Sequence, residues 1–153
     1  MVDRSAIGLT LEPFTVRAET GRLRFFAQAI GEENPIFVDE VAARAAGHDG
    51  LPLPPTFLFT MELDGPDPFG LFHRLGIDMG RLLHGEQSFA YHRVAHAGEA
   101  LTFTQRVADV FDKKGGALTF VVRETAVTDA AGGPVADLTT VLVVRNPGLK
   151  EVR

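Results

Sequence analysis

The chain has 153 residues, of which 45% are hydrophobic and 23% are charged, and this composition is typical of one globular domain rather than of a disordered or fibrous chain. Its 20 acidic and 15 basic side chains give a formal net charge of -5, which argues against a nucleic-acid partner. The lack of cysteine excludes disulfides and Cys-ligated zinc, while the absence of a signal-peptide pattern and of any 18-residue apolar run predicts a cytoplasmic protein with no membrane partner.

The first half of the chain predicts short helices separated by glycine and proline. In the segment 19–30, apolar residues recur at the spacing of one helical face, namely at Leu23, Phe26, Ala27 and Ile30. Gly31 and Pro35 then prevent this helix from continuing. A second helix is expected over residues 40–46, with Asp39 as its N-cap.

A third helix is expected directly after a proline-rich segment. Pro55 can occupy the first turn of a helix, where its missing N–H is not needed. Residues 57–63 are apolar on nearly all sides, which is typical of a buried helix, and the glycine and prolines of residues 64–68 end it. The chain has 12 phenylalanines, one tyrosine and no tryptophan, and such rings suit a dry core or an apolar ligand channel.

From residue 84 onward the period of the pattern becomes that of strands. Four strands are expected, over residues 84–94, 101–112, 117–128 and 135–145. The glycine-rich segments between the last three predict hairpin turns, and one face of the third strand carries the more polar set Thr119, Arg123 and Thr125. These features predict an antiparallel meander in an α+β fold, whose outer face or edge needs an oligomeric partner. The pattern equally allows a cone-shaped α+β fold such as the cystatin-like one.

Six stretches, in their order and spacing, resemble those of the MaoC-like hotdog hydratases and dehydratases. They are residues 25–37, 39–47, 53–57, 83–93, 97–101 and 142–145. More closely, they are similar to the FAS1-like dehydratase branch, which includes the substrate-binding subunit of a (3R)-hydroxyacyl-ACP dehydratase. The resemblance covers a core of about residues 10–147 in a single expected domain, residues 1–153.

This resemblance implies a hotdog fold, in which a curved antiparallel β-sheet wraps around a central α-helix. Hotdog domains pair side by side, and acyl thioesters bind at the interface of the pair. The implied chemistry is reversible hydration of a trans-2-enoyl thioester to an (R)-3-hydroxyacyl thioester, carried on CoA or on acyl carrier protein. No cofactor and no metal are expected for this chain.

The catalytic motif of the family is altered in this chain. Catalytic members carry Gly-Asp-x-Asn-Pro-x-His, in which the Asp and the His hold a water molecule and move its proton. The corresponding residues 31–37 keep Asn34 but place Glu32 at the Asp position and Phe37 at the His position. A phenyl ring cannot transfer a proton, and the loss of one member of such a pair lowers rates by orders of magnitude. Glu32 and Asn34 are therefore the catalytic candidates of a degenerate motif.

A second alteration concerns the start of the central helix. Catalytic members have a His-Gly pair there, and the glycine N–H donates to the thioester carbonyl, which is an oxyanion-hole contact. This chain has two prolines instead, so that Pro55 offers no N–H, and Thr56 is the candidate replacement. With Phe37 and Phe57, these residues are the expected substrate-binding group.

His84 and Glu86 are a second candidate catalytic pair. Alternate residues of a strand share a face, so this imidazole and carboxylate are expected to lie together. A cross-strand hydrogen bond or a subunit contact is the structural alternative for the same two residues.

The two alterations predict that the chain binds substrate in a heteromeric dehydratase and that a second hotdog chain supplies the catalytic Asp and His. One alternative is a homodimeric acyl-thioester-binding protein without catalysis. Another is an acyl-CoA thioesterase that uses Glu32 or Glu86 as its base or nucleophile.

Overall fold

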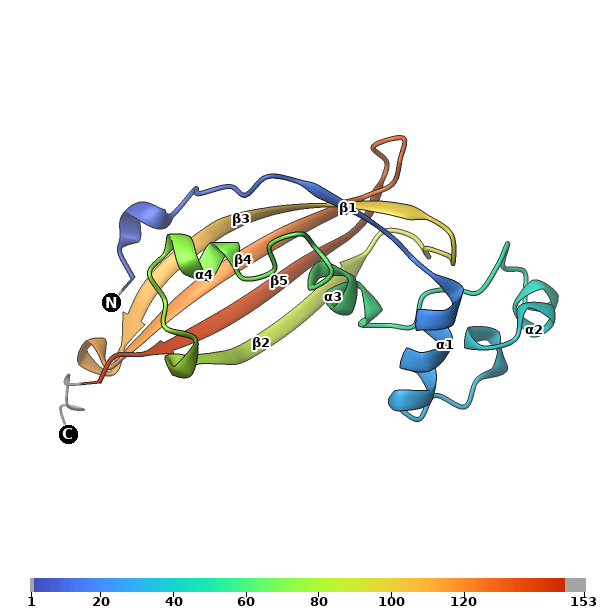
Figure 1. Cartoon of the computed structure of the whole chain (residues 1–153), viewed down its shortest axis with the longest axis horizontal. Coiled ribbons are helices and arrows are strands. Elements are labelled where there is room, and N and C mark those ends of the chain that lie inside the picture. Colours follow the sequence, from blue (N-terminus) through green and yellow to red (C-terminus); the bar gives the residue numbers. More distant parts are fainter. Residues whose placement is uncertain (1, 148–153) are drawn as a thin grey trace.

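The computed structural model describes residues 2–147, so the expected domain, residues 1–153, extends outside the described residues at both ends. Its framework is a five-stranded antiparallel sheet with the order β1-β3-β4-β5-β2 (Figure 1). The strands are β1 (Phe14–Arg17), β2 (Leu82–Tyr91), β3 (Ala100–Lys113), β4 (Leu118–Thr128) and β5 (Pro134–Arg145). The four strands predicted from the sequence are therefore present, with shifted ends.

The order of the strands departs from the predicted meander at β2. The strands β3, β4 and β5 are consecutive neighbours joined by the two predicted turns, but β2 pairs with β5 on the far side of the sheet. The segment 92–99 explains this, because it forms no tight hairpin and instead runs beside residues 51–53, where Leu53 N–H donates to the Ala95 carbonyl at 2.9 Å. The short strand β1, which pairs with β3, was not predicted, since four residues are too few to establish a period.

The buried face of the sheet carries several polar side chains. In β4 the polar set Thr119, Arg123 and Thr125 is buried, whereas Phe120 and Val122 on the other face are half-buried. Each member of this set has a polar partner, since Glu62 reaches the sheet and binds the Arg123 guanidinium at 2.6 Å and the Thr125 hydroxyl, while the Thr119 hydroxyl donates to Asp112 at 2.6 Å.

The helices are α1 (Thr20–Ala29), α2 (Glu40–Ala45), α3 (Phe57–Glu62) and α4 (Gly70–Arg74). The first three agree with the sequence predictions, and the Asp39 carboxylate caps α2 by accepting the Val41 N–H at 2.8 Å. Ile30 was expected on the buried face of α1 but is 52% exposed, because the helix ends one residue earlier. The five-residue helix α4 was not predicted.

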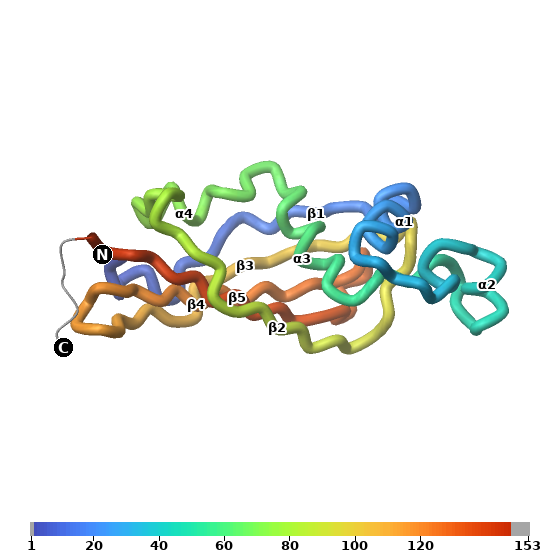
Figure 2. The backbone as a smooth tube through the Cα atoms, turned by 90° about the horizontal axis from the view of Figure 1, so that it is seen from below, coloured from blue at the N-terminus to red at the C-terminus, as the bar shows by residue number. Residues whose placement is uncertain are grey.

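Helices α3 and α4 lie on one face of the curved sheet, whereas α1 and α2 extend beyond one end of it (Figure 2). The expected architecture of an antiparallel sheet around a helix is therefore present, although α3 has only six residues. Four of its residues are buried, namely Phe57, Leu58, Met61 and Glu62. No helix within residues 2–147 is both long and apolar enough to cross a lipid bilayer.

Candidate functional site

A pocket of about 470 Å³ lies where the start of α3 meets the end of β2. Its volume is within the range of small-molecule sites, and its wall is mainly apolar. The wall consists of Ile36, Phe37, His48, Pro52, Leu53, Pro54, Pro55, Leu58, Tyr91, His92, Arg93, Val94, Ala95 and Val135. The pocket thus combines the altered motif, the two prolines and the strand end in one place.

The altered motif contributes an aromatic ring to the pocket and keeps its polar side chains outside. Phe37 lines the wall, whereas Glu32 and Asn34 do not. Asn34 Oδ1 accepts the Ile36 N–H at 3.2 Å, and Glu32 Oε1 accepts the Asn34 N–H at 2.9 Å. Both polar side chains therefore stabilise the turn before the short 3-10 helix Pro35–Phe37, which positions the Phe37 ring.

The segment before α3 places Pro55 in the wall and turns sharply at Thr56, whose φ is 75°. The Thr56 N–H donates to the hydroxyl oxygen of Tyr91 at 3.0 Å, so the candidate replacement donor already has a partner. Phe57 does not line the pocket, and its ring packs edge-on against the Phe26 ring at a centroid distance of 5.0 Å. Leu58, the next residue, occupies the wall instead.

His84 and Glu86 lie outside this pocket, exposed on the edge strand β2. The pairing of β2 with β5 shifts by one residue between them, at Gly85, where a Cβ atom would come within 2.9 Å of Val143 Cγ2. The expected alternation is therefore interrupted. His84 Nε2 lies 3.2 Å from the backbone carbonyl oxygen of Glu86 rather than beside its carboxylate, and the imidazole packs against the Phe59 ring.

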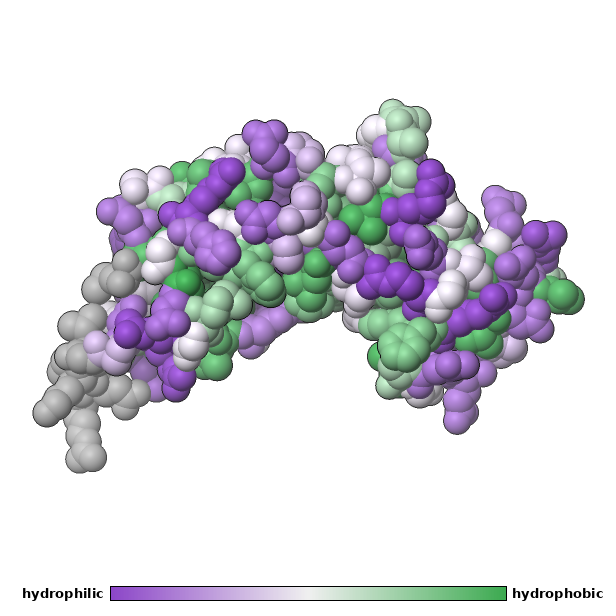
Figure 3. Space-filling model, in the orientation of Figure 1, coloured by the Kyte–Doolittle hydropathy of each residue, from purple (hydrophilic) through white to green (hydrophobic). Residues whose placement is uncertain are grey.

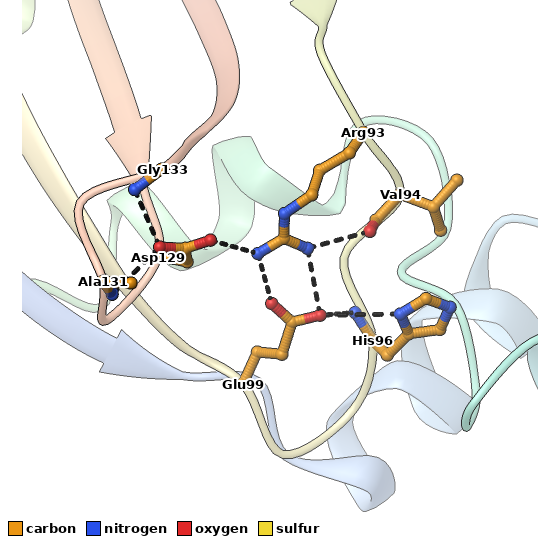
Figure 4. A network of polar contacts seen from close by, with 7 residues as sticks. All are labelled: Arg93, Val94, His96, Glu99, Asp129, Ala131 and Gly133. Atoms are coloured by element: carbon orange, nitrogen blue, oxygen red, sulfur yellow. Dashed lines mark hydrogen bonds and ion pairs between the residues drawn. The ribbon is translucent and has the colours of Figure 1, made fainter.

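A network of charged groups fixes the wall of the pocket at Arg93 (Figure 4). Arg93 donates to both carboxylate oxygens of Glu99, at 3.2 and 2.7 Å, and to Asp129 at 3.1 Å. The backbone N–H of His96 also donates to the Glu99 carboxylate, at 2.7 Å. Burial would raise the pKa of Glu99, but these hydrogen bonds outweigh it and hold the pKa below its usual value. The network joins the end of β2 to the β4–β5 turn.

The other histidines of this region also have partners. His92 Nε2 lies 2.7 Å from Asp137 Oδ2, and His48 Nδ1 lies 3.2 Å from His96 Nε2. These pairs have no signal in the sequence, since partners 45 and 48 residues apart share no local pattern. No group of three or more potential metal ligands occurs within the described part of the chain.

A second network, which is buried, holds α3 on the sheet. Glu62, which is 2% exposed, accepts hydrogen bonds from Gln105 at 2.8 Å, from Arg123 at 2.6 Å and from the Thr125 hydroxyl. Burial lowers the pKa of Arg123, and the charge of Glu62 partly offsets this effect. The sequence contained one signal for this network, the single charged residue in an otherwise apolar helix.

Residues 5–138 match the family model for the FAS1-like dehydratase domain region. Among curated relatives, a UPF0336 protein of Streptomyces griseus is 40% identical over 111 residues, covering 71% of this chain and 73% of its own. The UPF0336 protein SCO4636 of Streptomyces coelicolor is 36% identical over 116 residues, covering 74% and 77%. The names of these relatives state no activity.

Among solved structures, the chain is similar to the C-terminally truncated HadBC (3R-hydroxyacyl-ACP dehydratase) complex of Mycobacterium tuberculosis. The identity is 25%, the TM-score is 0.77, and the match covers 90% of this chain and 96% of that one. The ChsH1-ChsH2 complex of the same organism has 25% identity, a TM-score of 0.74 and coverage of 91% and 90%. A MaoC-like dehydratase of Phytophthora capsici shares the fold at 22% identity, with a TM-score of 0.77, and the match covers 98% of this chain but 52% of that protein.

Proposed function

The chain belongs to the FAS1-like dehydratase domain family and has a hotdog fold, and from this premise we propose that it is the substrate-binding subunit of an (R)-specific enoyl-thioester hydratase or 3-hydroxyacyl-thioester dehydratase. In this proposal the acyl group, carried on CoA or acyl carrier protein, binds in the apolar pocket. A catalytic hotdog partner supplies the Asp and the His.

The observation that carries the proposal is the pocket itself, where Phe37, which the resemblance places at the position of the family's His, forms part of the wall. Glu32, at the position of the Asp, is engaged in a backbone turn. Pro55 in the same wall has no N–H to donate. The pocket therefore offers apolar surface to an acyl chain but lacks the family's proton-transfer pair, which supports binding rather than catalysis.

A two-chain assembly is supported by the names of the similar structures, since HadBC and ChsH1-ChsH2 are both described as complexes. The edge strand β2 is the proposed contact, because it has a neighbour on one side only and is longer than β1, the other edge strand. Leu83 and Tyr91 on this strand are each 49% exposed, and hydrophobic surface extends over the middle of the face that shows β2 (Figure 3). A homodimer through the same edge is the alternative assembly.

Incubation of the purified chain with crotonyl-CoA tests the proposal. We expect the chain alone to bind the thioester without hydrating it, and we expect hydration after addition of a co-encoded hotdog protein with the complete Asp-x-Asn-Pro-x-His motif. Hydration by the chain alone would overturn the substrate-binding role. Hydrolysis of a saturated acyl-CoA would favour a thioesterase, and binding without hydration in the presence of that partner would favour a binding protein. A cytoplasmic location stays a prediction.

A further inference from the structure

The pocket has four polar side chains in its wall, and three of them are engaged elsewhere. The Arg93 guanidinium binds Glu99, Asp129 and the Val94 carbonyl. His92 has its Nε2 on Asp137, and His48 has its Nδ1 on His96. Most of the partners of these three side chains are therefore residues that do not line the pocket.

Tyr91, the only tyrosine of the chain, is the one side chain among the four with a neutral hydroxyl. Its hydroxyl oxygen accepts the Thr56 N–H at 3.0 Å, and no residue of the described part of the chain accepts its hydroxyl proton. A phenol accepts and donates at once, so this proton is available for a further hydrogen bond. The ring is held by stacking on Phe89, with 5.8 Å between centroids and 8° between planes. The hydroxyl is therefore a positioned donor in a mainly apolar wall.

A thioester in this pocket needs such a donor. Its carbonyl oxygen is only an acceptor, and moving it from water into apolar surroundings without a hydrogen bond is unfavourable. The hydrogen bond from the Thr56 amide also polarises the phenol, which strengthens the bond that the phenol donates. Pro55, in the same wall, cannot donate through its backbone.

We infer that the Tyr91 hydroxyl donates a hydrogen bond to the carbonyl oxygen of the bound acyl thioester and that the Thr56 amide positions this hydroxyl. The inference rests on the proposed function, because it takes an acyl thioester as the ligand. Tyr91 is then the residue that distinguishes a thioester from an apolar chain of the same length. It also gives Thr56 a positioning role in place of direct contact with the substrate.

The test compares two ligands that differ in the carbonyl. One is trans-2-decenoyl-CoA, and the other is S-(trans-2-decenyl)-CoA, a thioether that keeps the double bond but lacks the carbonyl oxygen. Calorimetric titration should show that Tyr91→Phe weakens binding of the thioester by about 3- to 10-fold, the value of one neutral hydrogen bond, and leaves binding of the thioether unchanged. His48→Gln is the control, because it alters another polar group of the wall and should not change the ratio of the two affinities.

Each outcome separates the inference from its premise. Wild-type protein that binds neither ligand overturns the proposed function together with the inference. Wild-type protein that binds both, with Tyr91→Phe changing the two affinities equally or not at all, overturns the inference alone. Infrared spectra of a carbonyl-labelled thioester add a second readout, since the band of the bound carbonyl should lie at higher frequency in Tyr91→Phe than in wild type. The same band position in both proteins would also overturn the inference.

Discussion

At the scale of single residues, Thr56 holds a backbone conformation that β-branched residues rarely adopt, with φ of 75° and an exposed side chain. A left-handed conformation costs an L-residue about 1–2 kcal/mol, whereas glycine adopts it freely. Glycine also increases the conformational entropy of the unfolded chain. This lowers the free energy of unfolding by about 0.4–1 kcal/mol and so opposes the gain. We expect Thr56→Gly to raise the free energy of unfolding by about 0.5–1 kcal/mol, measured by urea denaturation.

The matched control is Thr60→Gly, inside α3, where the backbone is helical. Glycine at such a position should lower the free energy of unfolding by about 0.3 kcal/mol, the difference between the helix propensities of the two residues. If Thr56→Gly lowered stability as much as Thr60→Gly does, the left-handed turn at Thr56 would carry no strain for glycine to relieve.

The sequence located part of this site and missed the rest for a physical reason. Phe37 and Pro55 were placed from the motif in which they stand, and both line the pocket. Tyr91 was missed because its partner, Thr56, is 35 residues earlier and is met only through the fold. Phe57 was included with the substrate-binding group because the sequence of a buried helix does not show which of its sides faces a pocket. The contact between the Phe57 and Phe26 rings depends on the fold and is seen only in the structure.

At the scale of elements, helix α3 is attached to the sheet by the Glu62–Arg123 pair, whose side chains are 1% and 4% exposed. Removing one partner leaves a buried charge without compensation, so we expect Glu62→Ala to lower the free energy of unfolding by about 3–5 kcal/mol. The double variant Glu62→Leu, Arg123→Met removes both charges and should recover most of this loss. Urea denaturation of the three proteins provides the comparison. Equal loss in the single and double variants would show that the unpaired charge is not the cause.

The Arg93 network predicts how stability depends on pH. The pKa values of Glu99 and Asp129 are held below their ordinary values of 4.5 and 3.8, chiefly by hydrogen bonds from Arg93 and from backbone N–H groups. A carboxyl group with a lowered folded-state pKa adds stability above its unfolded-state pKa and loses it as the pH falls through the folded value. We therefore expect the urea midpoint to fall as the pH is lowered through about 4.5 and below.

Arg93→Met separates this network from the other carboxylates of the chain. The variant should be less stable than wild type at pH 7, and its midpoint should fall less steeply in acid, so that the two curves converge. Parallel curves would show that other groups cause the acid sensitivity. Arg44→Met, at an exposed ion pair of 3.9 Å on α2, is the control and should follow the wild-type curve.

The elements themselves were predictable to the extent that their signals are local. The cap Asp39, the stop at Gly31 and the glycine-rich hairpin turns lie within a few residues of the ends that they fix, and these elements were found. The place of β2 beside β5 depends on contacts between segments 51–53 and 95–97, which no local pattern contains. The burial of Arg123 in β4 likewise depends on Glu62, 61 residues from it in the chain.

At the scale of the whole molecule, the free edge of β2 predicts how the chain associates. The free side of an edge strand exposes backbone donors and acceptors, and Leu83, which is 49% exposed, adds apolar surface beside them. Lysine on an edge strand opposes pairing, so we expect Leu83→Lys to weaken association with itself or with a hotdog partner by tenfold or more, about 1.4 kcal/mol, in sedimentation equilibrium. Val41→Lys is the control, since Val41 is 77% exposed on α2, beyond the end of the sheet. Equal weakening by both variants would point to a general effect of charge, and unchanged association in Leu83→Lys would exclude the β2 edge as the contact.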